Sequence, residues 1–426
     1  MLDVDLIRRH PDRVRQAAKN KGEEVDVERF LALDEERRDL IRQAEELRRR
    51  RNANSDRVAE LKRAGEDADA LIEETREISE EIKQVETALS GVQERFDEAA
   101  LTFPNIPPDD VPVGRGETDN VEIKHEGERA EFDFEPKPHW DIVKELDIID
   151  FDAATGIAGP FFALYKGAGA RLERALIQFM LDLHTRKHGY TEVSTPFLAN
   201  RAATTGTGQL PKLEDDMYLC ERDDLFLIPT AEVPVTNIHR GQVLDADDLP
   251  IRYTAYSPCF RREAGSYGRD TRGLMRIHQF DKVELVNFVR PETSWDRLET
   301  LLGEAEEVLR RLGIEYRVLE LCTGELSFAA AKCYDIEIWA PAIERWLEIS
   351  SCSNFTDFQA RRAGIRFKEK GGKPEFVHTL NGSGVALARL VLTIIEQYQT
   401  ADGCIRVPDA LRPYIGGLEQ IGGDRE

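Results

Sequence analysis

An arginine-rich stretch between two predicted strands is the part of the sequence best suited to chemistry. Residues 251–260 and 277–289 alternate apolar and polar side chains, which is typical of strands. Guanidinium groups form paired hydrogen bonds with phosphate oxygens, whereas an ordinary solvated loop accepts Lys equally well. The pattern predicts an antiparallel hairpin that binds phosphate, and an exposed loop with incidental arginines is the alternative. The glycine-rich connection carries these arginines: Arg261, Arg262, Arg269, Arg272 and Arg276.

A lone cation on an apolar helix is the second feature of this kind. Asn381-Gly-Ser-Gly384 predicts a turn in which the backbone can approach a neighbour closely. Residues 385–398 predict a helix that is almost wholly apolar and carries Arg389. Burial of an unpaired cation is costly, so Arg389 needs an anion beside it. A carboxylate of the protein and a bound phosphate both meet that need.

Several common catalytic signatures are missing. The sequence has no P-loop and no G-x-S-x-G, and Lys166-Gly-Ala-Gly-Ala170 lacks the third glycine of a dinucleotide loop, so it predicts a turn. His184 and His188 lie four apart on a helix predicted over 169–188. A metal pair needs more partners, so a surface pair is the favoured interpretation. None of the six cysteines forms a C-x-x-C pair, which argues against a zinc ribbon and against a disulfide framework.

The first hundred residues have a different character and predict two long helices. Apolar side chains recur at alternating steps of three and four over residues 30–61 and again over 71–99. Residues 64–69, with Gly65, interrupt the pattern as a turn would. Two such helices form an antiparallel coiled-coil hairpin, expected over about 27–100. At about 1.5 Å per residue, each helix would span roughly 45–50 Å.

The two predicted helices differ in charge. Basic residues outnumber acidic ones by eleven to nine over 28–63, whereas acidic residues outnumber basic ones by twelve to three over 66–98. A solvated coiled coil with complementary flanks is the favoured interpretation of this segment alone. The alternative interpretation is an arm that presents a cationic face to phosphates. The basic cluster consists of Arg48, Arg49, Arg50, Arg51, Arg57, Lys62 and Arg63.

The remaining organisation follows from composition. Four prolines within 104–112 exclude helix and mark a linker, which we place at 104–120. Residues 121–134 alternate and predict a pair of strands, and strands mix with helices after residue 153. A length of 426 residues predicts two or three domains.

Charge and hydropathy exclude some classes of protein. The net charge of −23 excludes a generally basic nucleic-acid binder, so any such surface must be local. The N-terminus has no apolar signal region, and no run of about 18 apolar residues occurs anywhere. The expected compartment is the cytoplasm, with no membrane partner.

Several of the sequence motifs described above resemble those of a known protein family. The strand–loop–strand with Phe260-Arg-Arg-Glu263 and Arg276 resembles motif 2 of the class II aminoacyl-tRNA synthetases. Residues 382–389 resemble motif 3, and the helix and strand from Arg171 to Pro196 resemble motif 1, which forms the dimer interface in that class. The class I strings HIGH and KMSKS are absent.

Within that class, the chain resembles the bacterial-type seryl-tRNA synthetases over essentially its whole length, including the N-terminal coiled coil. Arg262 is a departure, since many relatives carry a small residue there. It adds a charge beside the ATP site and removes none. The matching strings are Thr230-Ala-Glu232, Phe260-Arg-Arg-Glu-Ala-Gly265, Arg276-Ile-His-Gln-Phe-Asp-Lys-Val-Glu284, Glu348-Ile-Ser-Ser-Cys-Ser-Asn354 and Asn381-Gly-Ser-Gly384.

The resemblance implies an α+β protein in three parts. Residues 1–103 would form a tRNA-binding helical arm, residues 104–120 the linker, and residues 121–426 a class II catalytic domain. That domain would be built on an antiparallel β-sheet flanked by helices. Motif 1 would lie at about 171–196, motif 2 at about 251–289, and motif 3 at about 376–398.

The implied reaction joins serine to ATP as seryl-adenylate and transfers the seryl group to the 3′ end of tRNA(Ser), and also of tRNA(Sec), on a homodimer. A serine carboxylate is ionised at neutral pH, so its attack needs placement and charge neutralisation rather than a strong base. The implied catalytic cations are Arg261 on the α-phosphate and the serine carboxylate, Arg276 on the triphosphate, and Arg389 on the γ-phosphate.

The implied ATP site also has an adenine end and a metal. Glu263 would accept from the adenine amino group and Phe280 would stack on the ring. Glu348 and Ser351 would hold Mg²⁺ that accompanies ATP, because a hard cation prefers oxygen ligands; no zinc is expected. Taken alone, Glu348 is more typical of an ion-pair partner than of a metal ligand. The full ATP set is Arg261, Arg262, Glu263, Arg276, Ile277, Phe280, Glu348, Ile349, Ser350, Ser351 and Arg389.

The implied serine pocket must be polar, because a site built to bind a hydroxyl rejects alanine by leaving buried groups unpaired. Glu232 and Glu284 are the candidates for the amino group and the hydroxyl. Taken alone, Glu284 is equally a solvent-facing strand residue, and Thr230 is equally a helix N-cap. The serine set is Thr230, Ala231, Glu232, Arg261, Glu284, Asn381 and Ser383.

Two rival interpretations remain open at this stage. A paralogue that loads a non-tRNA acceptor would be expected to lack the arm, which this sequence keeps. A catalytically inactive coiled-coil scaffold would be expected to have lost Arg261, Glu284 or Arg389, and all three are present.

Overall fold

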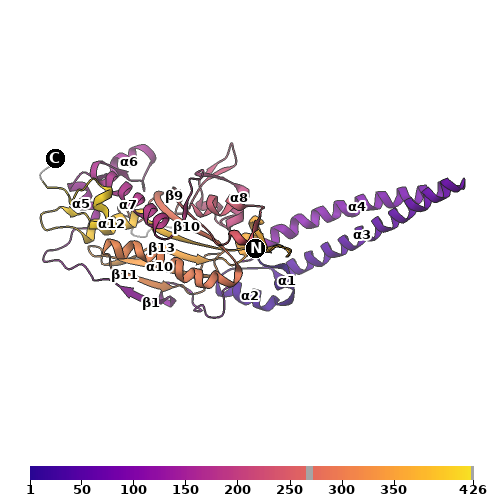
Figure 1. Cartoon of the computed structure of the whole chain (residues 1–426), viewed down its shortest axis with the longest axis horizontal. Coiled ribbons are helices and arrows are strands. Elements are labelled where there is room, and N and C mark those ends of the chain that lie inside the picture. Colours follow the sequence, from indigo (N-terminus) through magenta and orange to yellow (C-terminus); the bar gives the residue numbers. More distant parts are fainter. Residues whose placement is uncertain (265–271, 424–426) are drawn as a thin grey trace. The chain divides into compact units, whose positions relative to one another are not determined.

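The computed structural model describes residues 1–264 and 272–423, so Arg269 lies outside the described residues (Figure 1). The chain divides into two compact units. The first consists of Met1–Lys19 and Glu23–Pro104, and the second of Asn20–Gly22 and Asn105–Glu426.

The first unit contains the predicted helical hairpin. Its helices are α1 (Val4–Arg9), α2 (Pro11–Asn20), α3 (Val27–Ala64) and α4 (Asp69–Ala100), and α3 ends where Gly65 takes a left-handed conformation at φ 72°. All side chains at the predicted heptad positions of α3 and α4 are buried or half-buried. At about 1.5 Å per residue, the 38 residues of α3 span about 57 Å, longer than expected. Phe30 stacks on Phe96 at 4.8 Å and packs edge-on against Phe103 at 5.1 Å.

An eight-stranded sheet is the centre of the second unit, in the order β1-β11-β12-β13-β16-β10-β9-β4. Neighbouring strands are antiparallel except β4 and β9. Together with the helices, this sheet confirms the α+β prediction. Its strands are β1 (Val121–Glu126), β4 (Thr191–Glu192), β9 (Ile251–Phe260), β10 (Gln279–Val289), β11 (Tyr316–Glu320), β12 (Lys332–Ala340), β13 (Arg345–Asn354) and β16 (His378–Ala386).

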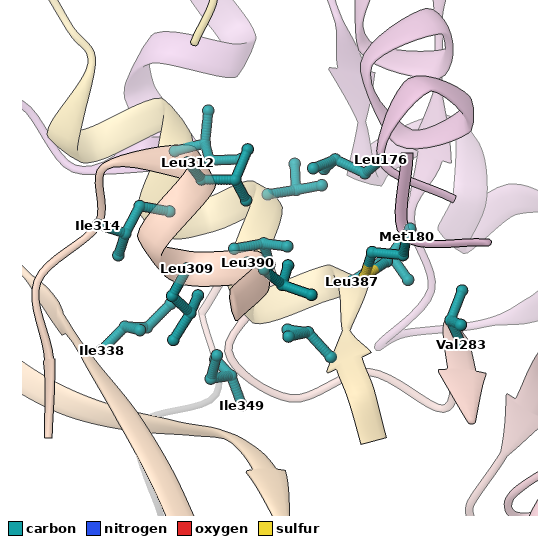
Figure 2. Close-up of a cluster of buried hydrophobic side chains, with 14 of the residues drawn as sticks. Leu176, Met180, Val283, Leu309, Leu312, Ile314, Ile338, Ile349, Leu387 and Leu390 are labelled. Atoms are coloured by element: carbon teal, nitrogen blue, oxygen red, sulfur yellow. The ribbon is translucent and has the colours of Figure 1, made fainter. Parts of the chain in front are cut away.

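Three helices cover one face of this sheet: α7 (Gly167–Arg186), α10 (Ser294–Leu312) and α12 (Leu387–Gln397). Their apolar side chains form the main core with those of the strands (Figure 2). Along β10, Val283 and Leu285 belong to this core. Because successive strand residues point to opposite faces, Lys282 and Glu284 point the other way.

Smaller elements complete the unit. The short helices are α5 (His139–Glu145), α6 (Phe151–Ala158), α8 (Arg201–Thr207), α9 (Glu232–Thr236) and α11 (Phe358–Ala363). The short strands are β2 (Ile149–Asp150), β3 (Leu164–Tyr165), β5 (Leu198–Asn200), β6 (Leu219–Cys220), β7 (Leu225–Leu227), β8 (Val243–Asp245), β14 (Arg366–Lys368), β15 (Glu375–Phe376), β17 (Ile405–Arg406) and β18 (Gln420–Ile421).

The glycine-rich segment Asn381–Gly384 is not the predicted turn but the middle of strand β16. The predicted close approach exists, although its partners are core atoms. A Cβ on Gly382 would lie 3.0 Å from Cys352 Sγ, and one on Gly384 would lie 3.0 Å from His184 Nε2. Glycine at these positions lets neighbouring elements pack tightly, and sequence alone cannot distinguish that from turn chemistry.

Two further sequence predictions were wrong. His184 is not on the surface: it is fully buried with its Nδ1 3.0 Å from that of His188, and burial lowers the pKa of His184 to about 3. Residues 121–134 supply the single strand β1 rather than a pair, because β1 pairs with the distant β11. All six cysteines are free thiols. Among the described residues, no helix has the length and apolarity needed to cross a bilayer.

Candidate active site

A cavity of about 710 Å³ lies on the face of the sheet opposite the main core. Phe280, Lys282 and Glu284 reach it from β10, and Asn381 and Ser383 reach it from β16. Glu284 is the Cα partner of Ser383, next to a shift in register between Val283 and Glu284. Because side chains alternate along each strand, this pair of strands presents polar side chains to the cavity and apolar side chains to the main core.

Most of the residues expected to bind ATP or serine line this one cavity. Three of them do not. Ala231 is fully buried at the start of α9, and Ser350 is buried with its hydroxyl 2.7 Å from Ser383 O. Arg262 is exposed, and its backbone N–H donates to Asp216 O at 2.9 Å. Their predicted roles stay predictions.

One end of the cavity is built around Glu284, which is 1% exposed and therefore no solvent-facing residue. Thr230 Oγ1 donates to Glu284 Oε2 at 3.0 Å and accepts from Lys282 Nζ at 2.7 Å. Lys282 also forms a buried ion pair with Glu284. Thr230 Oγ1 accepts from the backbone of Glu232 as well, at 3.2 Å. The helix N-cap alternative for Thr230 was nevertheless wrong, because Ala231 is the N-cap of α9 and no side chain caps that helix.

Glu232 lies at the same end, and neutral groups hold it. Gln359 Nε2 donates to Glu232 Oε1 at 2.5 Å, and Gln209 Nε2 lies 3.5 Å from Glu232 Oε2. Burial, together with the nearby charge of Glu284, raises the pKa of Glu232 to about 7. Glu232 forms no ion pair with any described residue, although the charges of Lys282 and Arg261 act on it, so its carboxylate can pair with a cationic group that enters the cavity.

The other end of the cavity is cationic and aromatic. The Arg261 guanidinium lies 5.2 Å from the centroid of the Phe280 ring, and its Nε donates to Pro229 O at 3.3 Å. Arg276 forms an ion pair with Glu263, whose backbone adopts a φ of 52°. A ligand with an anionic chain and an exocyclic amino group could engage each partner of that pair.

Arg389 enters the cavity from α12 and has a protein partner. Its Nη1 donates to Glu348 O at 2.6 Å and lies 3.8 Å from Glu348 Oε2. Ser351 Oγ donates to Glu348 Oε1 at 3.2 Å. Asp335 on β12 is the Cα partner of Ser351, and burial together with the charge of Glu348 raises the pKa of Asp335. Both alternatives for Arg389 therefore stay possible, because a bound phosphate would meet it at the cavity wall.

The comparisons with known proteins decide the family. Residues 1–107 match the model of the seryl-tRNA synthetase N-terminal domain, and residues 218–398 match the class II core domain of the tRNA synthetases for G, H, P, S and T. The chain is 57% identical over 423 residues to a serine–tRNA ligase of Listeria monocytogenes, with 99% of each chain covered. The chain belongs to the seryl-tRNA synthetase family.

Further relatives agree with this membership. A serine–tRNA ligase of Geotalea uraniireducens is 57% identical over 422 residues and covers 99% of this chain and 100% of that one. The crystal structure of seryl-tRNA synthetase from Pyrococcus horikoshii complexed with ATP superposes with a TM-score of 0.92 at 36% identity, with 100% of both chains covered. The chain is accordingly a class II serine–tRNA ligase, which uses ATP to activate serine for transfer to tRNA(Ser).

Sequence reasoning about this synthetase missed Lys282 and Asp335, which line the cavity, and Gln359, which contacts Glu232. Lys282 stands two positions before Glu284 on an alternating strand, so the shared face was a usable signal. Asp335 lines the cavity from β12, and no motif marked it. Gln359 is buried on α11, far along the chain from the Glu232 that it contacts, so only the fold reveals it.

The predicted tRNA-binding residues of the synthetase lie on α3 in the first unit and are exposed or half-exposed. Two of them form ion pairs with α4, Arg48 with Glu86 at 2.6 Å and Arg50 with Glu74 at 3.5 Å. Arg57 pairs with Glu60 on its own helix at 2.8 Å. Exposed pairs of this kind contribute at most about 1 kcal/mol, so phosphate oxygens can replace the glutamates.

Proposed function

We propose that serine and ATP bind side by side in the cavity, serine near Glu284 and ATP near Arg389. The single observation that supports this is that one continuous space joins the buried carboxylates of one end to the arginines of the other. Arg261 lines the space together with both sets. It is therefore the residue proposed to contact the serine carboxylate and the α-phosphate at once.

In the proposed reaction, a serine carboxylate oxygen forms a bond to the α-phosphorus while the bond from that phosphorus to the β-bridging oxygen breaks. Pyrophosphate leaves with the electron pair, and no proton is transferred. Arg261, Arg276 and Arg389 neutralise the charge that builds up on the phosphoryl oxygens. The terminal hydroxyl of tRNA then forms a bond to the seryl carbonyl carbon while the bond from that carbon to the phosphate oxygen breaks. AMP leaves with the electron pair, and the hydroxyl proton passes to the departing phosphate.

The proposed serine contacts follow from the pocket chemistry. Glu232 takes the ammonium group, since its carboxylate contacts the side-chain amides of Gln359 and Gln209 and has no ion pair among the described residues. Glu284 accepts from the hydroxyl, since Lys282 pairs with its carboxylate and Thr230 fixes its orientation. Asn381 and Ser383 close the pocket from β16. Alanine has no hydroxyl to donate to Glu284, so the pocket rejects alanine by leaving that hydrogen bond unmade.

At the adenine end, Glu263 accepts from the amino group and Phe280 stacks on the ring, while Ile277 and Ile349 line the wall. Mg²⁺ is proposed to accompany ATP on Glu348 and Ser351. Their oxygens fit a hard cation, and both face the cavity beside Arg389. The ion would neutralise phosphate charge. No group of three or more metal-binding His, Cys, Asp or Glu side chains occurs within residues 1–264 and 272–423.

The larger assembly is also a proposal. Residues 1–103 are assigned as the tRNA-binding arm, 104–120 as the linker and 121–426 as the catalytic domain. The resemblance of α7 and β4 to motif 1 supports a homodimer, in which the arm of one subunit serves tRNA(Ser), and also tRNA(Sec), charged by the other. The compartment is proposed to be the cytoplasm.

The test is serine-dependent ATP–pyrophosphate exchange beside charging of tRNA(Ser), with the full chain and with Arg261→Ala. The substitution is expected to lower both activities by at least about a hundredfold. Parent-level exchange by Arg261→Ala would overturn the assignment of the cavity. Exchange without any charging by the parent chain would favour the rival that loads another acceptor.

A further inference from the structure

A fully buried histidine lies directly behind the wall of the cavity. His139 is the first residue of α5, and its ring nitrogen Nε2 accepts from the backbone N–H of Leu274 at 3.1 Å. Leu274 itself lines the cavity. A backbone amide can only donate, so Nε2 carries no proton and the ring proton is on Nδ1.

The other side of the ring is held by an equally buried carboxylate. His139 Nδ1–H donates to Glu396 Oε1 at 2.8 Å, and the backbone N–H of His139 donates to the same oxygen at 3.0 Å. Glu396 Oε2 accepts from the backbone N–H of Ala342 at 3.1 Å. Both side chains are 0% exposed. The carboxylate therefore fixes the tautomer that Leu274 requires.

Helix α12 holds the cavity wall at two points. Glu396 and Arg389 are seven residues apart, which is about two helical turns and places them on one face. Arg389 Nε donates to Met275 O at 3.3 Å, while Glu396 reaches Leu274 through His139. Consecutive residues of the wall are thus fixed by one helix, once directly and once through the imidazole.

The wall segment is also shaped to receive the ring. Gly273 has a φ of 67°, and a Cβ there would overlap His139 Nε2. The Arg272 guanidinium lies 4.6 Å from the centroid of the Trp140 ring. Residues 272–274 therefore pack against His139 and Trp140, the first two residues of α5, just before Arg276.

We propose that His139 is a positioning residue for ATP, which holds Leu274 so that Arg276 and Ile277 face the nucleotide. The inference rests on the ATP assignment proposed above. His139 contacts no substrate in this scheme and acts only through the backbone of Leu274. Loss of that hydrogen bond would let the segment shift and would weaken ATP binding, while the serine end would stay as it is.

Two substitutions of His139 separate positioning from plain stability. Asn places an amide nitrogen where Nδ1 was, so it keeps the contact with Glu396 and loses the one with Leu274. Gln places an amide oxygen where Nε2 was, so it can still accept from Leu274. His139→Asn is expected to raise the KM for ATP in pyrophosphate exchange roughly five- to tenfold, and His139→Gln by less than about twofold.

Gly273→Ala places a Cβ against His139 Nε2 and so disturbs the hydrogen bond with Leu274 from the wall side. It is expected to raise the KM for ATP as His139→Asn does. None of these variants should change the KM for serine at saturating ATP. His378→Asn is the matched control, because His378 Nδ1 bonds Ser294 Oγ at 2.8 Å and does not line the cavity. It can keep the Nδ1 contact with Ser294, as His139→Asn keeps the one with Glu396, and it is expected to keep the KM for ATP.

Equal KM values for ATP in the Asn and Gln variants, or a parent value in His139→Asn, would overturn the positioning role. If His139→Asn fails to fold, Gly273→Ala and His139→Gln decide instead, and parent-like values in both would overturn it. Arg389→Ala distinguishes the underlying assignment: an unchanged KM for ATP there would show that the ATP site itself was misplaced.

Discussion

Lys282 Nζ lies 2.7 Å from the hydroxyl oxygen of Thr230. That hydroxyl also accepts from the backbone of Glu232 and donates its proton to Glu284. Its one proton and both lone pairs are therefore in use before any substrate binds. In the proposed serine site, Thr230 would therefore orient Glu284 rather than offer serine a free hydrogen-bonding group.

The first prediction follows from that saturated hydroxyl. Thr230→Val removes the hydroxyl that donates a hydrogen bond to Glu284 and accepts one from Lys282. The KM for serine is therefore expected to rise roughly tenfold. Thr230→Ser keeps the hydroxyl and should stay near the parent value. Pyrophosphate exchange at varied serine measures both. A parent-like KM for Thr230→Val would contradict the orienting role.

The second prediction concerns the buried ion pair. Lys282→Met leaves Glu284 charged and unpaired beside Glu232, so the unfolding free energy should fall by about 3–5 kcal/mol. Adding Glu284→Gln should restore most of that stability while serine activation stays lost. Thermal unfolding and exchange on the two single variants and the double variant form the cycle. Additive stability losses would show that the pair is not coupled.

The third prediction concerns pH. Because burial raises the pKa of Glu232 to about 7, its carboxylate is mostly protonated at pH 6 and mostly ionised at pH 8. Serine brings an ammonium group, so its KM should rise roughly tenfold as the pH falls from about 8 to about 6. Glu232→Gln should have a high KM without this pH dependence. A flat profile in the parent enzyme would rule out Glu232 as the ammonium partner.

The same residue gives a fourth prediction, on stability. The folded state holds the Glu232 proton more tightly than the unfolded chain does. Its contribution is therefore favourable at low pH and is lost as the pH rises from about 4.5 through about 7. Glu232→Gln is expected to melt at a higher temperature than the parent at about pH 8, and no higher near pH 4. The reverse order at pH 8 would count against a raised pKa.

The fifth prediction concerns the arm. Replacing Arg48 and Arg50 together by Gln should lower tRNA charging roughly tenfold at low salt, with a smaller difference at high salt, and leave pyrophosphate exchange unchanged. Arg42→Gln is the matched control, because Arg42 is exposed on the same helix and pairs with Asp39. Unchanged charging with reduced thermal stability would instead favour the interpretation of complementary coiled-coil flanks.

The sequence predicts helices and strands best where burial of one face imposes a repeating pattern of apolar residues. Steps of three and four located the seam of α3 and α4, and alternation located β9 and most of β10, because burial of one face imposes those periods. It predicts poorly where a residue's partner lies far along the chain. Gln359, Asp335 and His139 acquire their roles only when distant elements meet. Asn381–Gly384 was misread because glycine permits both tight turns and tight packing.

The hairpin of the first unit is anchored unevenly along its length. Aromatic rings interlock at its root, where Phe30 meets Phe96 and Phe103, but on α3 no side chain beyond Ala44 is fully buried. Amide hydrogens near the root should therefore exchange slowly and those toward Gly65 much faster. Apart from Ile78 and Ile82, which α4 still buries, the half of the hairpin near Gly65 would then deform more easily than the half near Phe30, as the proposed binding of an irregularly shaped tRNA would require.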